Sequence, residues 1–78
     1  MEARFAELDY AMSSVTLSAP PYNESLEGLT KQYVAAIHKY DDALGADEAK
    51  RRLADTAVEL APYCLPCVGT LDREREKY

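Results

Sequence analysis

The chain has 78 residues, of which 47% are hydrophobic and 29% charged, and its formal net charge is −5 because 14 acidic residues oppose 9 basic ones. A chain of this length encloses one modest core, and its apolar content lies above the range of disordered sequences, so we expect one folded domain over residues 1–78. The negative charge repels a phosphate backbone, which argues against nucleic acid as a ligand, and no stretch approaches the roughly 20 apolar residues that cross a bilayer.

The first expected helix covers about residues 2–14. Its apolar residues recur at spacings of three and four, which places them on one helix face: Phe5, Leu8, Met12 and Val15. The pair Pro20-Pro21 interrupts this period, because proline lacks the amide donor and pushes its predecessor out of helical geometry. We therefore expect a loop or extended linker over residues 16–22, laid across the domain surface.

The longest helical pattern covers residues 24–44, with Asn23 or Ser25 as its N-cap. Apolar side chains recur there at spacings of three and four throughout: Leu26, Leu29, Tyr33, Ile37, Tyr40 and Leu44. Such a seam packs against another helix in a bundle or coiled coil. Gly45 follows directly and suits the left-handed conformation in which many helices end.

A third helix is expected over about residues 47–61, with Asp47 as its N-cap. Gly45 and Ala46 leave only a short connection to the preceding helix. So short a loop favours an antiparallel hairpin, in which Leu53, Ala57 and Leu60 face the seam of the helix over 24–44.

Pro62 should end or bend this third helix, yet the apolar period continues through Cys64, Val68 and Leu71. We therefore expect a last helix over about residues 66–77 after a proline bend, with Pro66 in the first position, where a missing amide costs nothing. The predicted fold class is all-α: a small three- or four-helix bundle built on the antiparallel hairpin, with a proline-bent C-terminal helix.

Cys64 and Cys67 form the only constellation with chemistry of its own. Such a pair can close a disulfide, supply a reactive thiolate or contribute two metal ligands. Free cysteine is among the most buried residue types and Cys64 continues the apolar period, so core packing is the leading interpretation and a redox or regulatory disulfide the alternative. A zinc site is disfavoured because the chain offers one histidine and no further cysteine, unless two chains each supply a pair.

The sequence contains none of the motifs that announce an enzyme, such as a glycine-rich phosphate loop, His-Glu-x-x-His or a nucleophile elbow. His38 has Asp41 and Asp42 three and four residues ahead, but this spacing is common on any helix and no nucleophile accompanies it. We therefore expect no catalytic residue, no cofactor and no metal, and a protein that is not an enzyme.

Two features favour protein binding as the function. The chain has six Tyr against one Phe and no Trp, and tyrosine favours core edges and interfaces, although a small bundle also places Tyr at its rim. The apolar stripes of the middle helices are also wider than a two-helix contact uses, so the first helix or a second chain must cover them.

The predicted function is a non-enzymatic protein–protein interaction module or a small assembly or adaptor subunit. We expect it to be acidic and cytoplasmic and to self-associate as a homo-oligomer such as a homodimer, without nucleic acid or membrane as a partner. The expected interaction face consists of Leu26, Leu29, Tyr33, Ile37, Tyr40, Leu53, Ala57 and Leu60. The alternative function is a thiol redox switch that uses Cys64 and Cys67, and a third class is an acidic mimic that occupies a basic surface on a larger protein.

Overall fold

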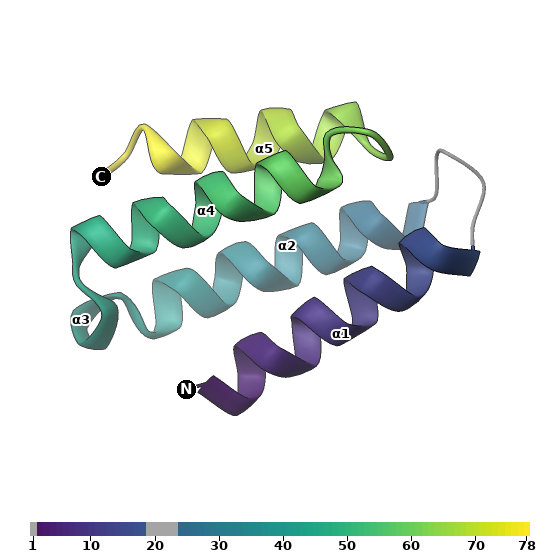
Figure 1. The fold of residues 1–78 in the computed structure, drawn as a ribbon. Coiled ribbons are helices and arrows are strands. Elements are labelled where there is room, and N and C mark those ends of the chain that lie inside the picture. Colours follow the sequence, from purple (N-terminus) through teal and green to yellow (C-terminus); the bar gives the residue numbers. More distant parts are fainter. Residues whose placement is uncertain (1, 19–23) are drawn as a thin grey trace.

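The computed structural model describes residues 2–18 and 24–78, and these residues form helices and no strand (Figure 1). The helices are α1 (Glu2–Ser18), α2 (Glu24–Lys39), α3 (Asp41–Leu44), α4 (Ala46–Leu60) and α5 (Leu65–Arg75). The predicted all-α fold class is confirmed. None of these helices is long and apolar enough to cross a membrane.

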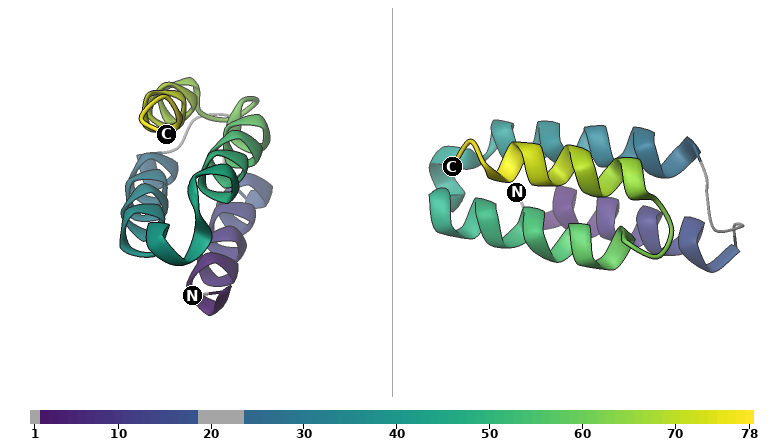
Figure 2. Two further views of the ribbon diagram at one scale, coloured as in Figure 1. Left: turned by 90° about the vertical axis from the view of Figure 1, so that its left-hand side faces the viewer. Right: turned by 90° about the horizontal axis from the view of Figure 1, so that it is seen from above.

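The four longer helices pack as a bundle in which two pairs are closest, α1 with α2 and α4 with α5 (Figures 1 and 2). The partners of each pair run antiparallel, and α2 also lies beside α5. In the end-on view of Figure 2, α2 and α4 lie across the bundle from each other, flanked by α1 and α5. The expected antiparallel course of α2 and α4 is therefore present, but the nearest neighbours of α2 are α1 and α5.

The connection between α2 and α4 explains this arrangement. Tyr40 leaves helical geometry at φ −112° and ψ 14°, so the expected helix over 24–44 is divided into α2 and the single turn α3. Gly45 then has a positive φ of 80°, but its ψ of 160° lies outside the left-handed conformation predicted for it. Because residues 40–45 all belong to the connection, it is long enough to carry the chain across the end of the bundle.

Helix α1 extends beyond residue 14 through Ser18, so the part of the expected linker that can be described is helical. The Thr16 hydroxyl donates to the carbonyl oxygen of Ser13 at 2.9 Å within this added turn. The restriction that Pro20 places on the preceding backbone applies to residue 19, so Ser18 can remain helical. Residues 19–23, which include the expected cap Asn23 and the rest of the predicted linker, lie outside the described residues.

The turn between α4 and α5 reverses the chain at Pro62. Helix α4 ends at Leu60, whose carbonyl oxygen accepts hydrogen bonds from the amides of Tyr63 at 2.9 Å and Cys64 at 2.8 Å. Cys64 is the N-cap of α5, which begins at Leu65 and ends at Arg75, so Pro66 takes the second helical position and not the first as predicted. The proline bend thus folds α5 back along α4.

The core lies between the four longer helices and contains the side chains whose periodicity predicted it. Its largest fully buried members are Phe5, Leu8, Met12, Leu26, Ile37, Leu53, Leu60 and Leu71. Burying one such side chain contributes about 1.5–3 kcal/mol to stability. The buried hydroxyls of Thr30 and Thr56 donate to carbonyl oxygens one turn back, those of Leu26 at 2.7 Å and Arg52 at 2.8 Å.

Candidate functional site

The structure joins Cys64 and Cys67 in a disulfide at the start of α5. Their Cα atoms are 5.3 Å apart, within the range that a disulfide can bridge, because a spacing of three residues spans about one helical turn. Both residues are buried, at 2% and 1% exposure, as the core-packing interpretation predicted. That interpretation needs one correction, because the pair contributes a disulfide to the core and not two free thiols.

The position of the disulfide places Cys64 among the amides that begin α5. The Cys67 amide donates to the Cys64 Sγ at 3.2 Å, so the sulfur atom acts as the helix cap. The first turn of α5 carries no acidic residue. Amide donors and the helix dipole favour electron-rich groups at this position, which suits the sulfur atom as a cap.

Exposed apolar residues precede, form and follow this turn in the chain. Val58, in the last turn of α4, is 76% exposed, and Leu65, in the first turn of α5, is 75% exposed. Ala61 and Pro62, between them in the chain, are exposed as well. We call Val58, Ala61, Pro62 and Leu65 the apolar corner.

The interaction face expected from the sequence lies mostly inside the bundle. Six of its members are buried: Leu26, Tyr33, Ile37, Leu53, Ala57 and Leu60. Leu29 and Tyr40 are partly buried and pack against the same core. These side chains hold the helices of one chain together, and the six buried ones are accessible to a partner only if the helices separate.

His38 lies on the surface, as expected, but its partner belongs to a different helix from the aspartates considered in the sequence. Its Nε2 is 2.8 Å from the Glu74 Oε2, and its ring stacks on Tyr78 with the centroids 6.5 Å apart. Lys77 also donates to Glu74 at 3.0 Å, and these two contacts, with Lys77 the larger cause, lower the pKa of Glu74. The arrangement links α2 to α5.

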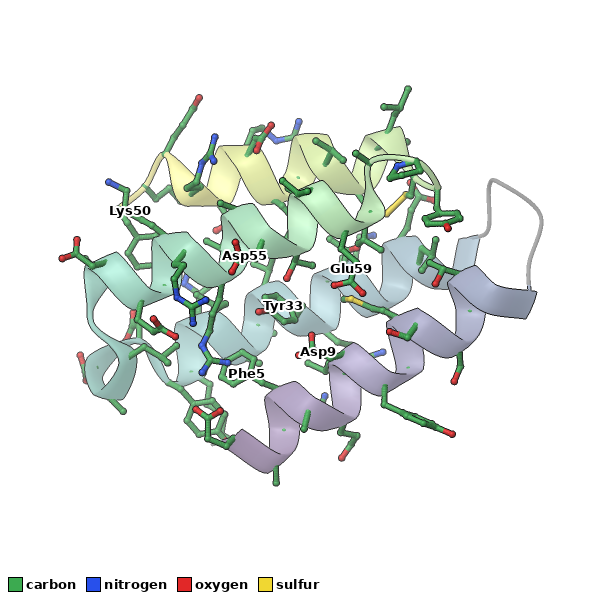
Figure 3. All side chains as sticks on the ribbon, viewed as in Figure 1. Phe5, Asp9, Tyr33, Lys50, Asp55 and Glu59 are labelled. Carbon is green, nitrogen blue, oxygen red and sulfur yellow. A yellow bond between two sulfur atoms is a disulfide. The ribbon has the colours of Figure 1, made fainter. Side chains whose placement is uncertain are left out.

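A polar groove of about 170 Å³ lies between α1 and α4 (Figure 3). Asp9, Tyr33, Asp55 and Glu59 lie around it, with Asp9 on α1 and Asp55 and Glu59 on α4. Partial burial raises the pKa of Asp9, while the Arg52 charge opposes that shift. Among the described residues, no group of three or more His, Cys, Asp or Glu could hold a metal ion.

Arg52 is the residue of this groove that sequence reasoning missed. It donates from α4 to Glu2 of α1 at 2.8 Å and to Glu48 of its own helix at 3.0 Å. Its guanidinium carbon lies 4.6 Å from the centre of the Phe5 ring. Helical spacing alone indicates the pair with Glu48, but the contacts with Glu2 and Phe5 depend on how α1 and α4 are placed.

Comparisons with protein-family models, curated proteins and solved structures find no match for this chain. The function is therefore argued from the chain's own geometry.

Proposed function

We propose that the chain is a non-enzymatic protein–protein interaction module that self-associates through the apolar corner. The observation that supports this is the exposure of Val58 and Leu65, at 76% and 75%, on the two helices that meet at the disulfide turn. Val58, Ala61, Pro62 and Leu65 are exposed within eight residues of the chain. A contact surface groups exposed apolar side chains, whereas singly scattered ones are normal.

The apolar corner takes the place of the interface expected from the sequence, because that face forms the core. A second copy of the chain supplies the same apolar side chains, so two corners can cover each other in a two-fold symmetric contact. Burial of aliphatic surface at about 25 cal/mol per Å² then drives association. The charged residues around the corner determine how the two copies are oriented.

Sedimentation equilibrium at increasing protein concentration tests this proposal. We expect the wild-type chain to form dimers with a dissociation constant on the order of micromolar. Val58→Glu and Leu65→Glu should each weaken the dimer at least about tenfold, because a carboxylate would have to lose water in the contact. Circular dichroism should show that both variants remain folded, since neither side chain belongs to the core.

Ala6→Glu is the matched control, because Ala6 is an exposed apolar residue on α1 and the substitution changes the charge equally. It should dimerise like the wild type. A wild-type chain that stays monomeric up to millimolar concentration would refute self-association. Equal weakening by Ala6→Glu would show that added negative charge, and not the corner, controls association.

The disulfide supports a second candidate function, a thiol redox switch at the same turn. An external dithiol would donate two electrons and two protons to the Cys64–Cys67 bond, leaving two thiols while the dithiol closes its own disulfide. Reduction frees the first turn of α5 from the covalent bond and allows Leu65 to move relative to Val58. The switch would thus alter the apolar corner without changing the helices that form the core.

Sedimentation of the wild-type chain with and without dithiothreitol tests the switch, with Cys64→Ser/Cys67→Ser as the control that cannot respond. We expect the reduced chain to dimerise more weakly and the double variant to behave identically in both conditions. Unchanged association after reduction, with the thiols verified by alkylation and mass spectrometry, would rule out the switch and leave the interaction module intact.

A further inference from the structure

A hollow of about 210 Å³ lies between α1 and α2, away from the apolar corner and its disulfide. Its lining combines cationic, amide, phenolic and small apolar groups: Arg4, Gln32, Ala35, Ala36, Lys39 and Tyr40. Neither of the proposed functions uses it.

The charge of this hollow is opposite to that of the whole chain. The chain has 14 acidic and 9 basic residues, yet the described residues of the lining include two cations and no carboxylate. Glu7 pairs with Arg4 at 2.7 Å, and the other terminal nitrogen of Arg4 is 3.4 Å from the Gln32 Oε1. Lys39 forms no ion pair within residues 2–18 and 24–78, so its charge is not neutralised by a neighbouring carboxylate.

The floor of the hollow is apolar and held in place. Ala36 is 5% exposed and belongs to the core. The Tyr40 ring packs edge-on against the buried Phe5 ring, with the centroids 6.0 Å apart. The ammonium of Lys39 lies 5.3 Å from the centre of the Tyr40 ring. A fixed aromatic face beside small methyl groups offers a flat surface for an apolar body.

We propose that this hollow binds a small organic carboxylate with an aromatic body. The ligand's carboxylate accepts hydrogen bonds from Lys39 and from Arg4, and the Gln32 amide supplies a further donor. Its ring lies on Ala35, Ala36 and Tyr40. The hollow is small and open to solvent, so a ligand of this size binds with a dissociation constant on the order of 1 mM.

The test is a titration of the ¹⁵N-labelled chain with phenylacetate at constant ionic strength, followed by amide chemical shifts. We expect saturable shifts centred on Ala35, Ala36, Lys39 and Tyr40. Benzyl alcohol, which keeps the ring and lacks the charge, should bind at least about fivefold more weakly, because it gives up a charge-assisted hydrogen bond.

Lys39→Gln should weaken phenylacetate binding about fivefold to tenfold, because the variant also loses a charge-assisted hydrogen bond to the carboxylate. Lys31→Gln is the matched control, since Lys31 is an exposed lysine on the same helix outside the lining. Absence of saturable shifts up to about 20 times the expected dissociation constant would overturn the proposal. So would equal weakening by Lys31→Gln, or equally tight binding of benzyl alcohol.

The same chemistry is present in a free acid and in the C-terminal phenylalanine of a peptide. A parallel titration with N-acetyl-Ala-Ala-Phe, whose terminal carboxylate is free, distinguishes the two sources. Tighter binding of the peptide identifies a polypeptide terminus as the ligand, and tighter binding of phenylacetate identifies a free acid. Either order supports the site.

Discussion

Arg52 shows how one side chain can connect two helices whose backbones do not pack closely. Its guanidinium joins Glu2 of α1 to Glu48 of α4 and lies over the Phe5 ring, and its side chain is only 16% exposed. An aliphatic residue there would keep the helix but lose the cation–π contact and both ion pairs.

We expect Arg52→Ala to lower the free energy of unfolding by about 1–2 kcal/mol, because a partly buried cation–π contact and two ion pairs are lost together. Arg51→Ala is the neighbouring control, since the Arg51 side chain is 58% exposed and its ion pairs among the described residues are with Glu48 and Asp55 of its own helix. That change should cost less than the loss of Arg52, because exposed ion pairs contribute little to stability. Urea unfolding followed by circular dichroism measures both, and an equal loss in the two variants would contradict the role given to Arg52.

The Glu48 carboxylate, which pairs with both arginines, makes a contribution to stability that depends on pH. Hydrogen bonds and charge attraction from Arg51 and then Arg52 lower the pKa of its carboxyl from 4.5 to about 2. Since the pKa is lower in the folded chain, its contribution to stability is present above about pH 4.5 and is lost as the pH falls toward 2. A carboxyl ¹³C titration should find this pKa, and Arg51→Gln should raise it toward 4.5. An unchanged value in Arg51→Gln would show that Arg51 is not the main cause.

At the scale of the helix, Gly45 determines where α4 begins. Its φ of 80° and ψ of 160° lie in a region that is essentially restricted to glycine. The conformation closes the turn after α3, because the Gly45 amide donates to the Asp41 carbonyl oxygen at 2.8 Å. The connection across the end of the bundle therefore depends on this residue.

We expect Gly45→Ala to destabilise the chain by about 1–3 kcal/mol, from backbone strain alone, since a Cβ there meets no atom of the described residues within 4 Å. Gly28→Ala is the opposite case, because Gly28 lies exposed within α2 and its added Cβ also meets nothing. It should stabilise the chain by about 0.5–1 kcal/mol. Thermal unfolding of both variants checks the prediction, and a Gly45→Ala variant as stable as the wild type would contradict it.

The helices themselves follow from the sequence more closely than their ends do. The seam that includes Leu26, Tyr33 and Ile37 predicts the buried face of α2. This works because apolar residues at helical spacing lie on one face, and that face is the one that packs into the core. The break at Tyr40 has no such signal, since a tyrosine fits a helix and a turn equally well. The continuation of α1 to Ser18 likewise has no signal in the sequence, because Pro20 restricts the backbone of the residue directly before it and leaves Ser18 able to be helical.

For the candidate site, the sequence predicted that Cys64 would be buried but left its bonding open, because buried thiols and buried disulfides share one apolar pattern. The sequence analysis also interpreted the strongest apolar stripes as a binding face. In this bundle, the side chains of these stripes form the core instead. Exposure at Val58 and Leu65, and the hollow beside Lys39, depend on which helices are neighbours. The apolar periodicity of each helix does not show which other helices will lie beside it.

At the scale of the whole molecule, the disulfide joins two residues at the start of α5, and this helix packs against both α4 and α2. We expect reduction to lower the free energy of unfolding by roughly 2 kcal/mol, the entropy that a short covalent loop removes from the unfolded chain. Urea unfolding with and without dithiothreitol measures this change. Cys64→Ala/Cys67→Ala should show no response to the reductant, and a wild-type chain equally insensitive would contradict the prediction.

The pairing of α1 with α2 and of α4 with α5 has a consequence for how quickly the native state is reached. Each pair joins segments that are neighbours along the chain, so most of the backbone can meet its partner after closing only a short loop. Such topologies refold in microseconds to milliseconds. We expect the slower step to be the docking of these two pairs, in which α2 comes to lie beside α5 and the Arg52 guanidinium comes to lie over the Phe5 ring.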